Sequence, residues 1–294
     1  MAHTVSAVSP PIHGQVRCQG PLGADQVVYR QLGDTGPWVI LLQGLGMAGE
    51  FWCELPEQLA GDSSAPSRVL VIDNRGVGGS SAPRGPYTIQ HLADDVVAVM
   101  DDAGASRATL VGLSMGGMIA QHVALRHPER VEGLVLMATT AGGHRMRPPS
   151  IRAVRTLLST PFARKGGKRG RAREFARLVL PDSRVDEYRE LLAVWKPVFD
   201  RNPMDPRSFF LQLGAVLSHL FSARPTRIRA PTVVIGAEDD LLIPASNSRA
   251  LAAAIPGAVL EVLPDVGHGI PLLAPDAVSR ALLQLRTRTG RVVD

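Results

Sequence analysis

Short runs of apolar residues recur along this chain, and they limit most strongly how it can fold. Helix-like stretches separate most of the runs, and most runs are apolar at nearly every position rather than at alternate ones. A strand has this composition when both of its faces are buried, as in a parallel sheet covered by helices. The pattern therefore predicts an α/β fold with a doubly wound, mostly parallel sheet. The seven strand candidates are QVVYRQL (26–32), WVILLQ (38–43), RVLVID (68–73), ATLVGLS (108–114), VEGLVLMAT (131–139), PTVVIGA (231–237) and AVLEVLP (258–264).

The alternation is interrupted once, in a stretch that begins with Gly and Pro pairs and contains two helix-like segments, at 186–199 and 207–221. We interpret this stretch as a helical cap inserted between two strands of one core. The second segment has an apolar stripe, most of which is expected to pack on the core, while its edge can line an acyl pocket. The predicted organisation is a mobile tail at 1–12, a core at 13–140 and 226–294, and the helical cap at 141–225.

Length and composition fit one globular α/β domain with an insertion. The chain has 294 residues, 45% of them hydrophobic, and no uninterrupted apolar stretch reaches the roughly 18 residues of a membrane helix. Its first residues lack the layout of a secretory signal, so we expect a soluble, cytoplasmic protein. Two cysteines, Cys18 and Cys53, are too few for a disulfide framework and match no zinc motif. We expect no metal, no organic cofactor and no nucleic-acid partner.

One part of the predicted cap is strongly basic. Between Arg145 and Arg177 there are eleven Lys or Arg residues and a single acid, Glu174, so this segment has a net charge of +10 in a chain of +5. Such a segment is usually a solvated face. It can also attract an anionic substrate or hold the protein weakly at an anionic surface.

A glycine-rich stretch after the second strand candidate allows two interpretations. Gly44-Leu45-Gly46-Met47-Ala48-Gly49 matches G-x-G-x-x-G between a strand and a potential helix, which is the context of a dinucleotide-binding turn. Asp73, at the end of the next strand candidate, has about the position of a ribose ligand in an NAD enzyme. The alternative is a loop that serves a different kind of active site.

A second motif favours that alternative. Gly112-Leu113-Ser114-Met115-Gly116 is G-x-S-x-G, placed at the end of a strand candidate and the start of a helix candidate. A tight strand-to-helix turn lifts a serine hydroxyl above the sheet edge, and glycines two residues before and after it avoid collisions in the turn. Ser114 is therefore a candidate nucleophile. His122 and His127, on the helix that follows, are expected to have packing or surface roles.

A serine hydroxyl is a weak nucleophile, so it needs a base that an acid holds in place. The last two strand candidates are each followed by a suitable residue: Asp239 and Asp240 after the first, and His268 after the second. Serine, acid and histidine in this chain order, with acid and base each just past the end of a strand, are typical of one fold. The chain resembles the α/β-hydrolase family over about residues 25–289.

This resemblance implies an oxyanion hole and gives the glycine-rich loop a role in it. The family commonly has His-Gly-x-Gly at this place, where the present chain has Gln43-Gly44-Leu45-Gly46. By the resemblance, the backbone N–H groups of Leu45 and Met115 form the oxyanion hole. The departure at Gln43 leaves these backbone donors in place. Asp73 would then belong to a structural turn rather than to a ribose site.

The two adjacent acids leave one choice open. The family pattern P-T-L-V-I-x-G-x-x-D-x-x-x-P matches without gaps if Ala237 takes the place of its glycine, and Asp240 is then the acid of the triad. If Gly236 is taken as that glycine, the acid is Asp239. We favour Asp240, with Asp239 as the alternative.

The resemblance implies a serine hydrolase that uses Ser114, Asp240 and His268 to form and hydrolyse an acyl-enzyme. The expected substrate is a small, mainly apolar carboxylic ester or lactone. GLSMGGMIAQ is similar to the elbow of enol-lactonases and PTVVIGAEDD to aclacinomycin-type methylesterases, while S-M-G-G also occurs in carbon–carbon bond hydrolases and monoacylglycerol lipases. An acyltransferase, a carbon–carbon bond hydrolase and a non-catalytic ligand-binding protein remain alternatives. A serine nucleophile excludes the dehalogenases and epoxide hydrolases that use an aspartate.

Overall fold

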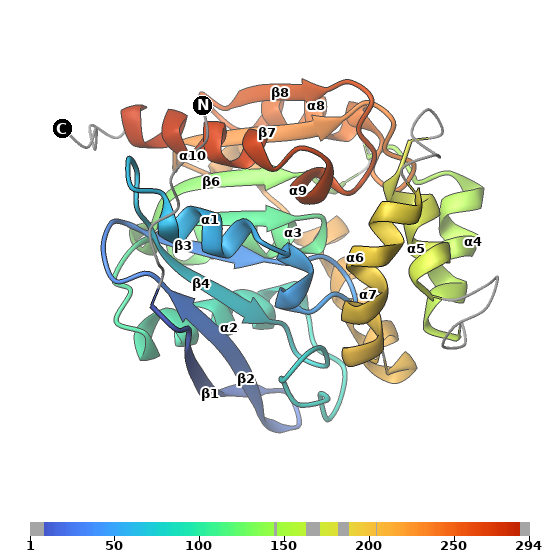
Figure 1. Ribbon diagram of the computed structural model, residues 1–294, viewed down its shortest axis with the longest axis horizontal. Coiled ribbons are helices and arrows are strands. Elements are labelled where there is room, and N and C mark those ends of the chain that lie inside the picture. Colours follow the sequence, from blue (N-terminus) through green and yellow to red (C-terminus); the bar gives the residue numbers. More distant parts are fainter. Residues whose placement is uncertain (1–8, 144–145, 163–170, 182–187, 204, 289–294) are drawn as a thin grey trace.

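The centre of the molecule is an eight-stranded sheet, with strands in the spatial order β1 (Ile12–Gly20), β2 (Gly23–Leu32), β4 (Arg68–Asp73), β3 (Trp38–Leu42), β5 (Ala108–Leu113), β6 (Val131–Met137), β7 (Thr232–Ala237) and β8 (Val259–Leu263) (Figure 1). The computed structural model describes residues 9–143, 146–162, 171–181, 188–203 and 205–288. β2 pairs antiparallel with β1 and with β4, and all other pairs are parallel. The predicted α/β class with a mostly parallel sheet is therefore confirmed.

The seven predicted strands all form, and β1 is an additional strand that the apolar pattern does not predict. It begins at Ile12, the last residue of the predicted tail, and residues 1–8 of that tail lie outside the described residues. β1 is an edge strand that pairs only with β2. Cys18 is its only buried side chain, so the strand lacks the continuous apolar run that marks a strand buried on both faces.

Helices cover both faces of the sheet, as expected for a doubly wound fold. On one face, apolar residues of the sheet pack with α2 (Ile89–Asp102), α3 (Met115–Arg126) and α8 (Ala245–Ala254). On the other face they pack with α1 (Leu55–Gly61) and α10 (Pro275–Arg288). All five residues of β3 are consequently buried. A short helix, α9 (Ile270–Leu273), precedes α10.

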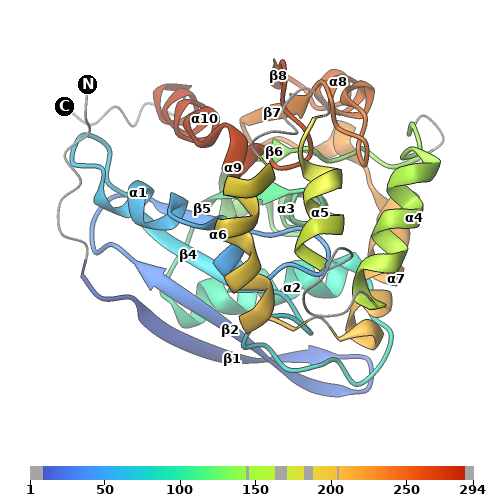
Figure 2. The ribbon, with the colours of Figure 1, turned by 45° about the vertical axis from the view of Figure 1, so that its right-hand side comes forward.

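Between β6 and β7 the described residues form four α-helices, which we call the inserted helices: α4 (Ile151–Ser159), α5 (Arg171–Val179), α6 (Tyr188–Arg201) and α7 (Pro206–Ser222). α6 and α7 coincide with the two helix-like segments predicted from the sequence, whereas α4 and α5 come from the basic segment. Figures 1 and 2 show the inserted helices beyond the ends to which the parallel strands point. The boundaries predicted for core and cap stay a prediction.

The two ends of the described chain lie far from the inserted helices. The beginning of β1 and the last turn of α10 are both on the side of the sheet opposite to these helices (Figures 1 and 2). Within the described ranges, no helix combines the length and the apolar composition that crossing a membrane requires.

Candidate active site

The candidate site residues gather at one edge of the sheet. The glycine-rich loop follows β3, Ser114 follows β5, Asp240 lies three residues after β7, and His268 lies in the loop after β8. These four strands are parallel to their sheet neighbours along β4-β3-β5-β6-β7-β8, so their carboxyl ends open on the same side. Loops at this edge are where open α/β sheets bind ligands.

Ser114 occupies a sharp turn between β5 and α3. Its φ of 54° and ψ of −114° are unusual for a residue other than glycine, and α3 begins directly after it at Met115. A Cβ at Gly116 would collide with the carbonyl of Leu42, and a Cβ at Gly112 would collide with the backbone of Gly116. The geometry thus gives a physical reason for both glycines of G-x-S-x-G. A strained conformation of this kind is typical of functional positions.

The structure brings Asp240 and His268 together. The Nδ1 of His268 donates a hydrogen bond of 2.7 Å to Oδ2 of Asp240, and both side chains are buried. Oδ1 of Asp240 accepts the backbone N–H groups of Leu242 and Ile243, each at 2.8 Å. The carboxylate is therefore fixed from two sides. Because Nδ1 carries the proton that is donated, Nε2 of the neutral imidazole is left free to act as a base.

Asp239 has different surroundings from its neighbour. Its side chain is exposed, and its backbone N–H donates to the carbonyl of Val266. No hydrogen bond joins its carboxylate to His268 among the described residues. The sequence left open whether Asp239 or Asp240 pairs with the histidine, and Asp240 is the acid in contact with it.

Ser114 and His268 face one cavity of about 240 Å³. The described part of the chain contains no hydrogen bond between the Ser114 hydroxyl and His268, so the structure places the pair at the same cavity without joining them. Catalytic hydrogen bonds are often long in the absence of substrate and tighten when it binds. The arrangement is therefore compatible with a nucleophile and its base.

The wall of this cavity is almost entirely apolar. Apart from the Trp195 indole, its polar side chains are those of Gln43, Ser114, Thr140 and His268, and none of its described lining residues is charged. All four inserted helices contribute to the wall, through Leu157 of α4, Phe175 and Val179 of α5, Trp195 of α6, and Leu213, Val216, Leu217 and Leu220 of α7. The stripe on α7 lines the cavity at these four positions. The expectation that most of it packs on the core is wrong, because Phe209 is its one buried residue, while Phe210 and Phe221 are exposed.

The glycine-rich loop is a turn with most of its N–H groups already bonded. Met47 N–H donates to the Gly44 carbonyl at 3.2 Å, and Gly46, at the third position of this turn, has a φ of 72° that favours glycine. Gly44 N–H donates to the side chain of Gln43, and Gly46 N–H to the side chain of Gln212. In the described chain the N–H of Leu45 has no acceptor.

The Met115 N–H has no acceptor among the described residues either. It is the first residue of α3, and the N–H groups of Gly117 and Met118 both donate to the Ser114 carbonyl instead. Met115 and Leu45 both line the cavity next to Ser114. Two unpaired backbone donors beside a serine are the elements from which an oxyanion hole is built.

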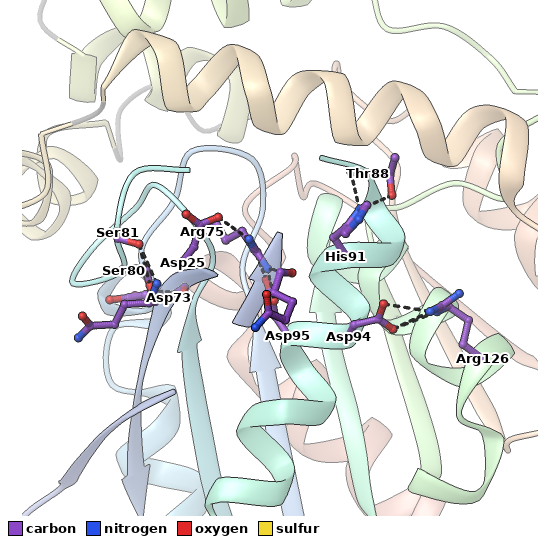
Figure 3. A network of polar contacts seen from close by, with 12 residues as sticks. Asp25, Asp73, Arg75, Ser80, Ser81, Thr88, His91, Asp94, Asp95 and Arg126 are labelled. Atoms are coloured by element: carbon purple, nitrogen blue, oxygen red, sulfur yellow. Dashed lines mark hydrogen bonds and ion pairs between the residues drawn. The ribbon is translucent and has the colours of Figure 1, made fainter. Parts of the chain in front are cut away.

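Asp73 is engaged within the protein, which removes the basis for a ribose site. Its Oδ1 accepts the Gly49 N–H at 2.6 Å and its Oδ2 accepts the Gly79 N–H at 2.8 Å. Burial raises the pKa of its carboxyl, while these two bonds oppose that shift. Figure 3 shows Asp73 beside Ser80, whose hydroxyl donates to the Asp73 carbonyl. The residue closes a structural turn, as the hydrolase interpretation requires.

Two histidines outside the site have the roles expected from their positions. His122 is buried beside His219 of α7, with ring centroids 5.3 Å apart, and His127 is half-buried within 3.3 Å of Asp94. Neither lines the cavity. Cys18 and Cys53 are free thiols. In the part of the chain that is described, no three His, Cys, Asp or Glu side chains form a group suited to a metal ion.

Gln212 is a residue at the site that the sequence interpretation missed. It is fully buried on α7 and bonds the glycine-rich loop. The sequence does contain a feature that points to Gln212. It interrupts the apolar stripe on the buried side of its helix, and a buried polar side chain needs hydrogen-bond partners. Its partner could not be read from the sequence, since Gly46 lies 166 residues away.

Comparisons with known proteins agree with the fold. Residues 37–275 match the family model described as alpha/beta hydrolase fold. A putative carbamate hydrolase from a Caulobacter species is 30% identical over 246 residues, which are 83% of this chain and 88% of that protein. A putative non-heme bromoperoxidase from Mycobacterium tuberculosis is 31% identical over 254 residues, or 85% of this chain and 94% of that protein.

A solved structure extends the similarity to three dimensions. The crystal structure of an enol-lactonase from Burkholderia xenovorans has a TM-score of 0.71 and 29% sequence identity, and the alignment covers 90% of this chain and 97% of that chain. The family model covers well over half of the present sequence. The chain therefore belongs to the α/β-hydrolase family.

Proposed function

We propose that the protein is a serine hydrolase that cleaves a small, mainly apolar carboxylic ester or lactone. The observation that carries this proposal is the Asp240–His268 hydrogen bond at a cavity that Ser114 also lines. Esters and lactones share an acyl carbon that a serine can attack. The similarity to an enol-lactonase supports a reaction of this type.

In the proposed mechanism His268 removes the proton of the Ser114 hydroxyl as its oxygen attacks the substrate carbonyl. The N–H groups of Leu45 and Met115 stabilise the negative oxygen, and Asp240 stabilises the protonated imidazole. His268 then gives its proton to the leaving alcohol, which leaves an acyl group on Ser114. Water, activated by the same histidine, releases the acid. This sequence needs no metal and no organic cofactor.

The apolar wall supports an apolar substrate. A buried charge without a partner is costly, and no charged side chain among the described lining residues would compensate one. The cavity of about 240 Å³ is smaller than the roughly 300–1,000 Å³ of pockets for drug-sized ligands, so a small substrate fits the proposal best. The inserted helices act in it as a cap that shapes the acyl pocket.

The test of this function is the Ser114→Ala variant. We expect it to lose ester hydrolysis by a factor on the order of 10⁶, as loss of the nucleophile does in another serine hydrolase. Covalent labelling by a fluorophosphonate should disappear with it, and the far-ultraviolet circular dichroism should not change. Retention of a tenth of the wild-type rate in the pure variant would refute the assignment.

A panel of p-nitrophenyl esters and lactones separates hydrolysis from the alternatives. A steady rate over many turnovers is the expected result. One burst that stops at a single turnover would instead indicate an acyltransferase that lacks its acceptor, or a ligand-binding protein.

A further inference from the structure

We propose that Gln212 of α7 is a positioning residue that holds the oxyanion hole in shape. The proposal rests on the function proposed above, because it concerns the Leu45 donor. Gln212 belongs to the inserted helices, whereas its partners belong to loops after β3 and β4. It therefore connects the predicted cap directly to the catalytic loop.

The side-chain amide of Gln212 makes two hydrogen bonds and is fully buried. Its Oε1 accepts the Gly46 N–H at 2.7 Å, and its Nε2 donates to the Arg75 carbonyl at 2.8 Å. One partner can only donate and the other can only accept, so the orientation of the amide is determined by both. With either hydrogen bond alone the amide group could still rotate, whereas the two bonds together hold it in one orientation.

The bond to Gly46 acts on the peptide group that determines the shape of the turn. In the turn from Gly44 to Met47, the central peptide joins Leu45 to Gly46, and two common turn types differ by a flip of this peptide. The positive φ of Gly46 corresponds to one of the two orientations. Gln212 accepts the N–H of that same peptide. It thus favours the observed orientation over the flipped one.

The neighbouring peptide, between Gly44 and Leu45, carries the N–H assigned to the oxyanion hole. Its carbonyl, that of Gly44, accepts the Met47 N–H and so closes the same turn, which makes the position of this peptide depend on that of the turn. A flip of the central peptide leaves the φ of Leu45 unchanged, so Gln212 acts on this donor by fixing the position of the turn. Without the bond to Gly46 the turn can shift, and the Leu45 N–H shifts with it. Gln212 therefore acts on the oxyanion through Leu45 without touching the substrate, since it does not line the cavity.

Gln212 is in turn held by a rigid neighbourhood. Arg75, whose carbonyl it bonds, has a fully buried guanidinium in contact with Asp25 and Asp95, and both Arg75–Asp95 bonds measure 2.6 Å (Figure 3). These ion pairs fix the loop after β4. Gln212 of α7 therefore links the turn from Gly44 to Met47 to a loop that is fixed on the core of the sheet.

The experiment uses Gln212→Met, which keeps the length of the side chain and removes both hydrogen bonds. We expect kcat for a p-nitrophenyl ester to fall about 10- to 100-fold, because removal of a whole oxyanion donor costs roughly 10²–10³ and a misplaced donor costs less. KM should stay within about twofold. The affinity of an alkyl boronic acid, whose tetrahedral adduct on Ser114 places a negative oxygen in the same hole, should fall by a similar factor to kcat.

Ser218→Ala is the matched control on the same helix. Ser218 accepts the Ile89 N–H at 3.0 Å and so ties α7 to α2, but it contacts neither the catalytic turn nor the cavity. Its loss should leave kcat and boronate affinity unchanged. Equal losses in both variants would mean that any loosening of α7 impairs the enzyme, and would overturn the proposal.

Gln212→Glu is the conservative variant. It retains an oxygen that accepts the Gly46 N–H, so its kcat should lie closer to wild type than that of Gln212→Met. A folded Gln212→Met protein with the kcat and boronate affinity of wild type would also overturn the inference. If wild type itself neither turns over esters nor labels with a fluorophosphonate, the proposed function fails instead, and the two failures are distinguishable.

Discussion

Asp239 and Asp240 are adjacent in sequence but differ in every physical respect that matters to a triad. Asp240 is 4% exposed and bonded to His268, whereas Asp239 is exposed to solvent. A buried carboxylate selects one tautomer of the imidazole and stabilises its protonated form. An exposed carboxylate does neither, because water competes for it.

This difference predicts the ranking of two conservative variants. Asp240→Asn should lower kcat by about 10⁴ at neutral pH, as loss of the orienting acid does in serine proteases. Asp239→Asn should retain nearly the wild-type rate. Steady-state hydrolysis of a p-nitrophenyl ester measures both, and the reverse ranking would transfer the role to Asp239.

The buried histidine pair between α3 and α7 predicts a loss of stability in acid. Burial lowers the pKa of His219 to about 4 and, with the neighbouring His219, that of His122 to about 3. Both rings are therefore neutral in the folded protein, and each gains a proton on unfolding at any pH between these values and about 6.5. The contribution of these two neutral rings to the stability of the fold is complete above about pH 6.5 and is lost as the pH falls toward 4.

The expected result is a free energy of unfolding that falls by about 1.4 kcal/mol per pH unit for each such histidine between pH 6 and 4. His122→Leu removes one of the two protons, so its slope should be smaller by about that amount. Urea denaturation at several pH values measures both slopes. Identical slopes for the two proteins would show that His122 contributes nothing to the acid sensitivity.

At the level of single residues, the sequence predicts what local geometry determines. Ser114 was identifiable because Gly112 and Gly116 are required by its turn, and His268 because it follows a strand. Gln212 was not identifiable as a site residue, because its partners Gly46 and Arg75 are more than a hundred residues away. Contacts of this kind depend on how distant elements pack.

At the level of elements, the strands that could be predicted from the sequence are those buried on both faces of the sheet. Strands β2 to β8 could be predicted because most of them are continuous apolar runs. β1 could not, because one of its faces is in solvent. α4 and α5 were not predicted as helices because each has only nine residues, too few for a clear helical period, whereas α6 and α7 have 14 and 17 residues.

The position of α7 at the cavity predicts control of chain length. Val216 lines the cavity, so Val216→Phe should reduce its volume and shift the preferred p-nitrophenyl ester toward acyl chains about two carbons shorter. The measurement is kcat/KM across a series of chain lengths.

Val194→Phe is the matched control for that variant. Val194 lies on α6, is 48% exposed and does not line the cavity, so the same substitution there should leave the preference unchanged. A Val216→Phe enzyme with the wild-type profile would show that the acyl chain binds elsewhere.

At the level of the whole molecule, charge and exposed apolar side chains coincide on the inserted helices. Ile151 is 80% exposed and Phe221 is 83% exposed. Arg152 and Arg155 are exposed on α4. Five further basic residues of the same segment lie outside the described residues: Arg145, Arg164, Lys165, Lys168 and Arg169. A basic surface with protruding apolar groups is typical of proteins that bind anionic lipid interfaces.

We therefore expect the protein to bind phosphatidylserine vesicles weakly and in a salt-sensitive manner. Each basic residue near such a surface contributes about 1 kcal/mol, so Arg152→Ser with Arg155→Ser should lower vesicle partitioning about fivefold per arginine at low salt. High salt should abolish the difference, since the Debye length shrinks to about 3 Å at 1 M. Vesicle sedimentation measures the partitioning.

Arg17→Ser with Arg229→Ser removes the same charge from exposed positions outside the inserted helices and serves as the control. If both double variants partition like wild type, the basic segment is a solvated face. A neutral, soluble ester should be hydrolysed at the same rate by all three proteins.

The separation between the ends of the described chain and the inserted helices has a practical consequence. An anchor fused to either end would emerge from the side of the sheet opposite to the inserted helices, whose side chains line the cavity. Protein tethered to a bead or sensor by such an anchor would present the inserted helices to the flowing liquid. Immobilisation through a lysine or arginine on these helices would instead turn them toward the support.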